Sequence, residues 1–207
     1  MPELSNIQTI EKINGLDFKP IIERFSKVLR NVHLWNETIK DAFEKFEWNV
    51  EKNGFVYFST EQLSPIFSKF LNIEVRPLVM AYTPEIDATF NDNWIMCELL
   101  IETEKLRNVE NGEFYDTTYP FVKFLASEMQ KEFTQAGIYF TDEAQDGEDF
   151  DGIRNNDLSK LWQFDYALIP LTLENVYRKK PETHYMKNSK NGFETWNMHR
   201  WKEKPNQ

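Results

Sequence analysis

Two hydrophobic periodicities follow one another along this chain, and their order limits the folds that it can adopt. Apolar residues recur at three- and four-residue steps over 17–32, 36–46 and 117–136, which is typical of helices with one buried face. Elsewhere apolar residues alternate or form short runs, as strands do. Because the chain shows no regular strand–helix–strand alternation, we expect an α+β fold with helices packed on a largely antiparallel β-sheet.

Capping residues indicate where the helices begin and end. Asp17 and Asn36 can accept backbone N–H groups at the starts of the first two helices, and Thr117 or Thr118 begins the third. Gly137 is expected to stop that third helix. A fourth, short helix is expected over 66–71. It begins either with a capping box at 59–62 or with a Ser-Pro cap at 64–65.

Short apolar runs bounded by turn residues predict the strands. Pro77 removes a backbone donor, so we place its strand at a sheet edge or bulge. The stretch from Trp94 is ambiguous between strand and helix, and the Asn111-Gly112 turn downstream favours a strand. The predicted strands cover 55–58, 73–82, 94–104 and 164–173, with a final hairpin at 185–198.

Length and composition set the expected organisation. The 207 residues suffice for one sizeable core, and a hydrophobic fraction of 41% is ordinary for a globular protein. We therefore expect one domain over 1–207, with an acidic loop near 142–157 and a basic, aromatic hairpin near 174–204. The net charge of −10 disfavours nucleic acid and favours a basic protein partner. Without a signal peptide or a long apolar window, we expect a soluble, cytoplasmic protein and no membrane contact.

The acidic loop is the first candidate site. Its carboxylates could contact a basic partner, or they could offer hard oxygen ligands to Ca²⁺ or Mg²⁺. The spacing does not fit an EF-hand, because a second carboxylate stands where that loop requires glycine. A solvated surface loop is the favoured interpretation. The candidate partner-binding residues are Asp146, Glu148 and Asp149, and the candidate metal ligands are Asp146, Asp149 and Asp151.

The C-terminal segment is the strongest candidate. From Glu174 to Gln207 it carries eight Lys or Arg residues against four Glu, with aromatic residues between them. Trp, Tyr and Arg form interface hot spots, and the same mixture could stack on a single-stranded nucleic acid. Alternatively the segment docks on the acidic body and only balances its charge. The interface residues that we predict here are Tyr185, Trp196, Arg200 and Trp201.

Isolated reactive side chains point to structural roles. The single cysteine, Cys97, lies in an apolar run, where a thiol is expected to be buried and inert. Three histidines, His33, His184 and His199, match no zinc spacing. Glu98 and Asp165 each interrupt an apolar run. Buried, they would be general-acid candidates, but we expect them on a wet face of the sheet.

Three functions remain open at this stage. The favoured one is a non-catalytic, acidic protein-binding protein of the immunity, antitoxin or inhibitor type. It is motivated by small size, acidity and the lack of glycine-rich phosphate loops or hydrolase motifs. The alternatives are a metal-assisted enzyme using the acidic loop and a nucleic-acid binder using the basic C-terminal segment. No cofactor is expected.

Overall fold

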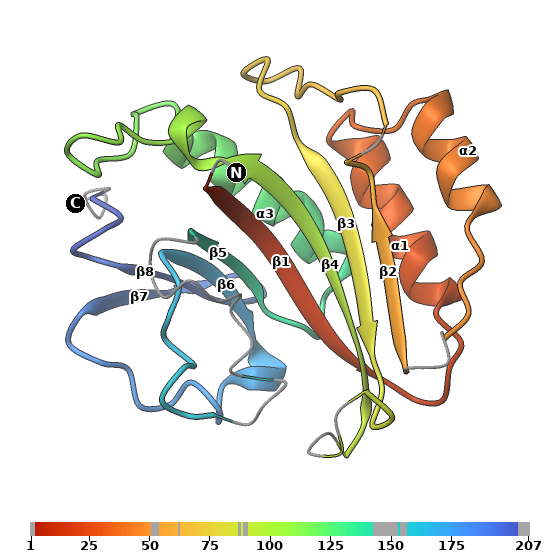
Figure 1. The fold of residues 1–207 in the computed structure, drawn as a ribbon. Helices are drawn as coiled ribbons and strands as arrows, with labels where there is room; N and C mark the ends of the chain where they lie inside the picture. The colour runs from red at the N-terminus through yellow and green to blue at the C-terminus, as the bar shows by residue number, and fades with distance from the viewer. Residues whose placement is uncertain are drawn as a thin grey trace.

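The computed structural model describes residues 3–50, 54–61, 63–86, 88, 91–142, 153 and 157–202. These residues form a curved eight-stranded sheet with the order β2-β3-β4-β1-β5-β6-β8-β7 (Figure 1). Each pair of neighbouring strands runs antiparallel, which together with the helices confirms the α+β class. The strands are β1 (Leu4–Ile13), β2 (Phe55–Ser59), β3 (Arg76–Tyr82), β4 (Asn93–Glu102), β5 (Ile138–Asp142), β6 (Tyr166–Pro170), β7 (His184–Ser189) and β8 (Gly192–Asn197).

Three helices cover one face of this sheet, and they lie behind it in Figure 1. They are α1 (Lys19–Asn31), α2 (Glu37–Lys45) and α3 (Thr118–Glu132). Their apolar stripes pack with alternate strand residues, such as Ile7 and Cys97, into the main core. The helices begin close to the predicted starts, and the cap predicted at Asn36 is confirmed. The N-cap position of α1 is Phe18 rather than Asp17, and Thr117 at the N-cap of α3 makes no capping hydrogen bond. Asn36 Oδ1 accepts a hydrogen bond from the Ile39 amide at 2.9 Å, and Asp17 Oδ1 accepts one from the Lys19 amide at 3.2 Å.

Two smaller apolar clusters lie apart from the main core. In β1, Ile7 and Ile13 belong to the main core, whereas Ile10 belongs to a smaller cluster. Since successive strand side chains point to opposite faces, that cluster lies on the other face of the sheet. Its buried members are Ile10, Leu78, Met80 and Met96. The second small cluster is built around Tyr139, Leu161, Phe164, Ala167, Ile169 and Tyr177.

Two helix predictions are wrong. Residues 63–71 form no helix. Phe67 instead makes an isolated bridge to Glu74, and Gln62 lies outside the described residues. Helix α3 ends at Glu132, five residues before Gly137. A larger residue at 137 would instead require the buried Tyr139 ring to shift, because an added Cβ would lie 2.1 Å from its hydroxyl.

The edge position predicted from Pro77 is also wrong, since β3 lies between β2 and β4. The proline is tolerated because β2 has already ended beside it. The last β2 residue, Ser59, pairs with Leu78. Beyond it, the hydroxyl of Thr60 donates to the Pro77 carbonyl at 3.1 Å. Pro77 therefore sits where no strand requires its missing N–H.

Candidate functional site

The structure divides the predicted acidic loop. Asp142 is the last residue of β5, and its side chain is fully buried. Asp146, Glu148, Asp149 and Asp151 lie outside the described residues, so their roles toward a partner or a metal remain predictions. Among the residues that the structure describes, no three His, Cys, Asp or Glu side chains gather as a metal site would require.

The C-terminal hairpin forms as predicted, but it contributes its large aromatics to the core. Trp196 and Trp201 are 2% and 0% exposed, whereas Tyr185 is half-buried. The Trp201 ring contacts four aromatic rings from other parts of the chain, those of Phe114, Tyr119, Phe140 and Tyr166. A partner docking on the surface would reach Tyr185 and Arg200, but neither of the two buried tryptophans.

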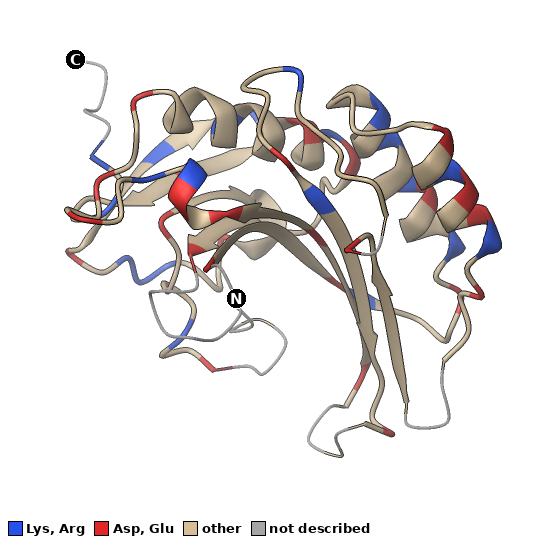
Figure 2. Cartoon of the chain, turned by 45° about the horizontal axis from the view of Figure 1, so that its top comes forward, with Lys and Arg blue, Asp and Glu red and all other residues tan. Residues whose placement is uncertain are grey.

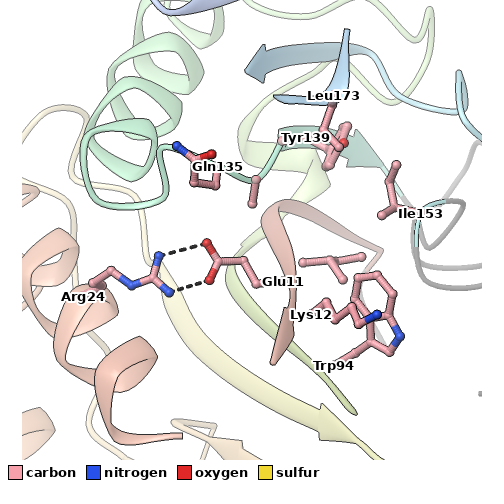
Figure 3. Close-up of a pocket in the computed structure, with 11 residues that line it drawn as sticks. Glu11, Lys12, Arg24, Trp94, Gln135, Tyr139, Ile153 and Leu173 are labelled. Carbon is pink, nitrogen blue, oxygen red and sulfur yellow. Dashed lines mark hydrogen bonds and ion pairs between the residues drawn. The ribbon is translucent and has the colours of Figure 1, made fainter. Parts of the chain in front are cut away.

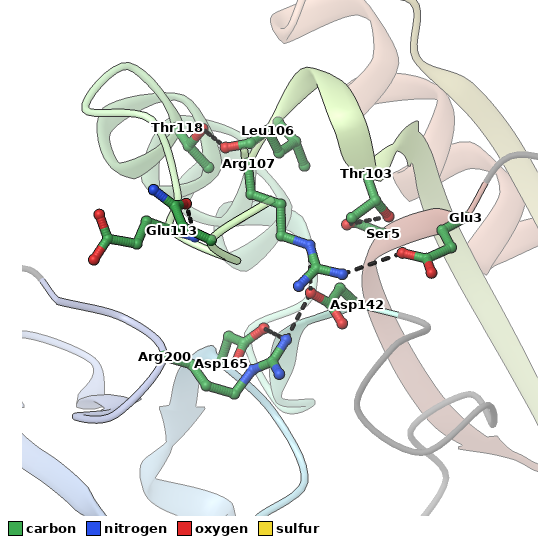
Figure 4. Close-up of polar contacts among 11 residues, drawn as sticks. Glu3, Ser5, Thr103, Leu106, Arg107, Glu113, Thr118, Asp142, Asp165 and Arg200 are labelled. Carbon is green, nitrogen blue, oxygen red and sulfur yellow. Dashed lines mark hydrogen bonds and ion pairs between the residues drawn. The ribbon is translucent and has the colours of Figure 1, made fainter. Parts of the chain in front are cut away.

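Arg200 is held in a network of charges (Figure 4). Its guanidinium donates to Asp165 Oδ1 and to Asp142 Oδ2, each at 2.6 Å. Arg107 extends the network, with its Nε 3.4 Å from Asp142 Oδ2 and its Nη2 3.1 Å from Glu3 Oε2. The five residues tie together the residue before β1, the turn after β4, the end of β5, the residue before β6 and the C-terminal segment.

Asp165 and Glu98, expected on a wet face, are both buried, at 0% and 1% exposure. Asp165 is buried because Arg200 compensates its charge within hydrogen-bond distance. Glu98 faces Gln8 across the β1–β4 ladder, and Gln8 is fully buried too. Desolvation raises the pKa of Asp165 to about 7, against the opposing effect of Arg200.

The remaining single residues are structural or exposed. Cys97 is buried, which confirms its expected position, and burial raises the pKa of its thiol well above the usual value. His33 follows the end of α1 and is exposed, as is His199. His184 is buried against the rings of Trp162 and Phe164. Burial lowers the pKa of His184 to about 4.

The pKa shifts of Asp165 and His184 predict opposite dependences of the unfolding free energy on pH. The folded pKa of Asp165 lies above its unfolded value of about 3.9, so its contribution is lost as pH rises toward 7. The folded pKa of His184 lies below its unfolded value of about 6.5, so its contribution is lost as pH falls toward 4.

Relative to wild type, Asp165→Asn should make the unfolding free energy rise more steeply with pH. His184→Gln should make it rise less steeply or fall. Urea unfolding at a series of pH values between 4 and 7 measures both slopes, and parallel curves for all three proteins would contradict the assignment.

Strands β4 and β5 both end at one end of the sheet, beside the start of β1. In the ladders of β1, Leu4 pairs with Glu102 at the end of β4, and Ser5 pairs with Asp142 at the end of β5. Residues 102–116, here called the acidic turn segment, carry five carboxylates against two cations. The second acidic stretch of the sequence begins directly after Asp142. Helices α1 and α2, at the right of Figure 2, carry charges of both signs instead.

The acidic turn segment also exposes apolar side chains. Val109 is 68% exposed and Tyr115 is 43% exposed, close in sequence to the exposed carboxylates Glu110, Glu113 and Asp116. Glu113 pairs with Lys202 at 2.5 Å. Glu110 and Asp116 have no ion-pair partner within the described part of the chain. Both therefore keep their charge available to a cation from outside.

Comparison with protein-family models, with curated proteins and with solved structures finds no match to this chain. Within the described residues, no helix combines the length and the apolar character needed to cross a bilayer. Sequence reasoning did not single out the acidic turn segment. Its signal, Val109 and Tyr115 among carboxylates, is visible in the sequence once the strand ends are known.

Proposed function

We propose that this protein is a non-catalytic binding protein that docks a basic protein partner against the acidic turn segment. The observation that carries the proposal is the exposure of Val109 and Tyr115 beside unpaired carboxylates, at a sheet end where a second acidic stretch begins. Apolar contacts surrounded by charges of one sign match the anatomy of protein interfaces. The apolar residues hold the complex, and the charges steer association.

The nucleic-acid alternative loses support from the aromatic residues of the C-terminal segment. Tyr177, Trp196 and Trp201 are buried in the two larger apolar clusters, so they present no ring face to a base. Of the five interleaved aromatics, Tyr185 and Phe193 keep partial exposure. Base stacking on aromatic rings is the main sequence-tolerant contribution to single-strand binding. The C-terminal segment therefore offers a single strand few rings to stack on, and this favours a protein partner over a nucleic acid.

The test compares two baits that lose the same charge. In the first, Glu110→Gln, Glu113→Gln and Asp116→Asn neutralise the acidic turn segment. In the matched control, Glu23→Gln, Glu37→Gln and Glu44→Gln neutralise three exposed carboxylates of α1 and α2. The partner is to be captured from a lysate of the producing organism by the wild-type protein, then purified. We expect the partner to associate more slowly with the first variant than with the wild type, and equally fast with the control variant. Added salt should slow its association with the wild type.

A second pair of variants separates steering from contact. Val109→Ser with Tyr115→Ser should speed dissociation, because exposed apolar anchors govern the off-rate. Leu171→Ser with Val176→Ser, which are exposed apolar residues elsewhere, should leave dissociation unchanged. Equal binding by all four variants would contradict the proposal. A partner that loses affinity when Tyr185 or the C-terminal Lys and Arg residues are substituted would also contradict it.

A further inference from the structure

The sheet opens along half of its longest strand. All ten residues of β1 pair with β4, but β5 pairs only with Ser5–Thr9. Beyond Thr9, the four residues up to Ile13 have a neighbour on the β4 side alone among the described strands. A cleft of about 450 Å³ lies beside them, between β1 and the turn that precedes β5 (Figure 3).

The cleft separates the two small apolar clusters. Ile10 and Trp94 come from one cluster and form one wall, and Tyr139 and Leu173 come from the other and form the facing wall. Leu173 ends the short 3-10 turn η2 (Leu171–Leu173). Apolar walls of this kind favour the entry of apolar side chains, since burial of apolar surface drives binding.

A charge pair also lines the cleft (Figure 3). Both oxygens of the Glu11 carboxylate accept from the guanidinium of Arg24, one of them at 2.9 Å from Nη1. Arg24 also donates to the carbonyl of Glu132 at 3.3 Å. Because Glu11 and Arg24 satisfy each other, they bring no net charge to the cleft and select for no charged ligand.

The ladder geometry shows which backbone groups face the cleft. The Thr103 amide donates to the Glu3 carbonyl at 2.9 Å, so Glu3 is bonded toward the β4 side. In an antiparallel ladder the bonded residues alternate along the strand. Odd-numbered residues of β1 therefore point their N–H and C=O groups toward β4, and even-numbered residues point theirs the other way. By this alternation the N–H and C=O of Lys12, past the last β5 partner, face the cleft.

We propose that this cleft binds an extended peptide segment with apolar side chains, which pairs with β1 at Lys12 as an added strand. An extended backbone offers the donor and acceptor that Lys12 requires, and its alternate side chains enter between the apolar walls. Four residues of an extended chain rise about 13 Å, the length of β1 left beside the cleft. The proposal is independent of the acidic turn segment, which can fail its own test while the cleft still binds peptide.

Hydrogen exchange tests the open strand edge. In the free protein, the Lys12 amide should exchange faster than its neighbour, the Glu11 amide, which is bonded to β4. The probe is a blocked peptide of alternating Thr and Val. At saturation it should slow exchange at Lys12 and leave exchange at Glu11 unchanged, with a dissociation constant below about 1 mM. A Lys12 amide that is already as slow as Glu11, or that is unaffected by the peptide, would overturn the proposal.

Methylated peptides and two matched variants exclude a nonspecific apolar contact. Methylating the amides along one edge of the peptide should abolish binding, and methylating the other edge should not, because only one edge pairs with Lys12. Leu173→Lys should weaken binding by about tenfold or more, whereas Leu171→Lys, outside the cleft and 60% exposed, should not. Melting curves establish that both variants fold. Equal binding of the two methylated peptides, or of the two variants, would contradict strand pairing.

Discussion

Replacing Arg200 with Ala is expected to destabilise the protein by about 3–5 kcal/mol, because it leaves two buried carboxylates without their principal cation. Asp142 and Asp165 each accept a hydrogen bond from this guanidinium at 2.6 Å, and neither side chain reaches solvent. Within the described part of the chain, the cation that remains beside Asp142 is the more distant Arg107, at 3.4 Å. Urea unfolding of the variant and the wild type at pH 8, above the Asp165 pKa of about 7 in the wild type, measures the loss.

Two further variants identify the source of that loss. Arg178→Ala removes an exposed arginine of the C-terminal segment and should change the unfolding free energy by less than about 0.5 kcal/mol. At that pH, adding Asp165→Asn to Arg200→Ala removes one of the two buried charges that lose this guanidinium, and it should recover part of the stability. If Arg200→Ala unfolded at the wild-type urea concentration, the network would be a surface feature of little energetic weight.

Replacing Trp201 with Ala is expected to cost about 3–5 kcal/mol, as removal of a large buried side chain does. The ring is fully buried, and it joins the C-terminal segment to α3, β5 and β6 through stacked and edge-on contacts. Thermal melting followed by near-ultraviolet circular dichroism should show a lower midpoint or a protein already unfolded at room temperature.

A nearby side chain supplies the control. Met198, which is 45% exposed, should tolerate substitution by Ala with little change in the melting midpoint. The sequence alone also allowed an interface role for Trp201, which makes a different prediction. A folded Trp201→Ala variant with a wild-type melting curve and lost partner binding would move this residue from the core to a binding surface.

The sequence predicts those parts of the fold that local pattern controls. The stripes of α1 and α3 and the cap at Asn36 each depend on residues a few positions apart. The final hairpin depends on a turn between two short runs. Strand β1 was missed for a related reason. Ser5, Asn6, Gln8 and Thr9 interrupt its apolar residues, although all four are buried at the centre of the sheet.

The candidate sites could be predicted only in part. The acidity of the chain and the basic, aromatic C-terminal segment are visible in composition, and both led to Arg200 and its neighbours. Whether a tryptophan there meets a partner or the core depends on what packs against it, and in Trp201 four distant rings do. The cleft beside β1 has no sequence signal at all. It exists because β5 begins opposite Thr9 rather than four residues further along β1.

The sequence by itself determined the fold class, the positions of the three helices and the sign of the net charge. Periodicity is a property of residues close together in the chain, and net charge is a sum over all residues. Only the tertiary structure decided which charges are buried and which segments meet. Asp165 is buried because Arg200, 35 residues away, returns to pair with it. The acidic turn segment and the stretch after Asp142 begin at one end of the sheet because β4 and β5 both end beside the start of β1. Long-range pairing of strands sets these neighbours, and no local pattern encodes it.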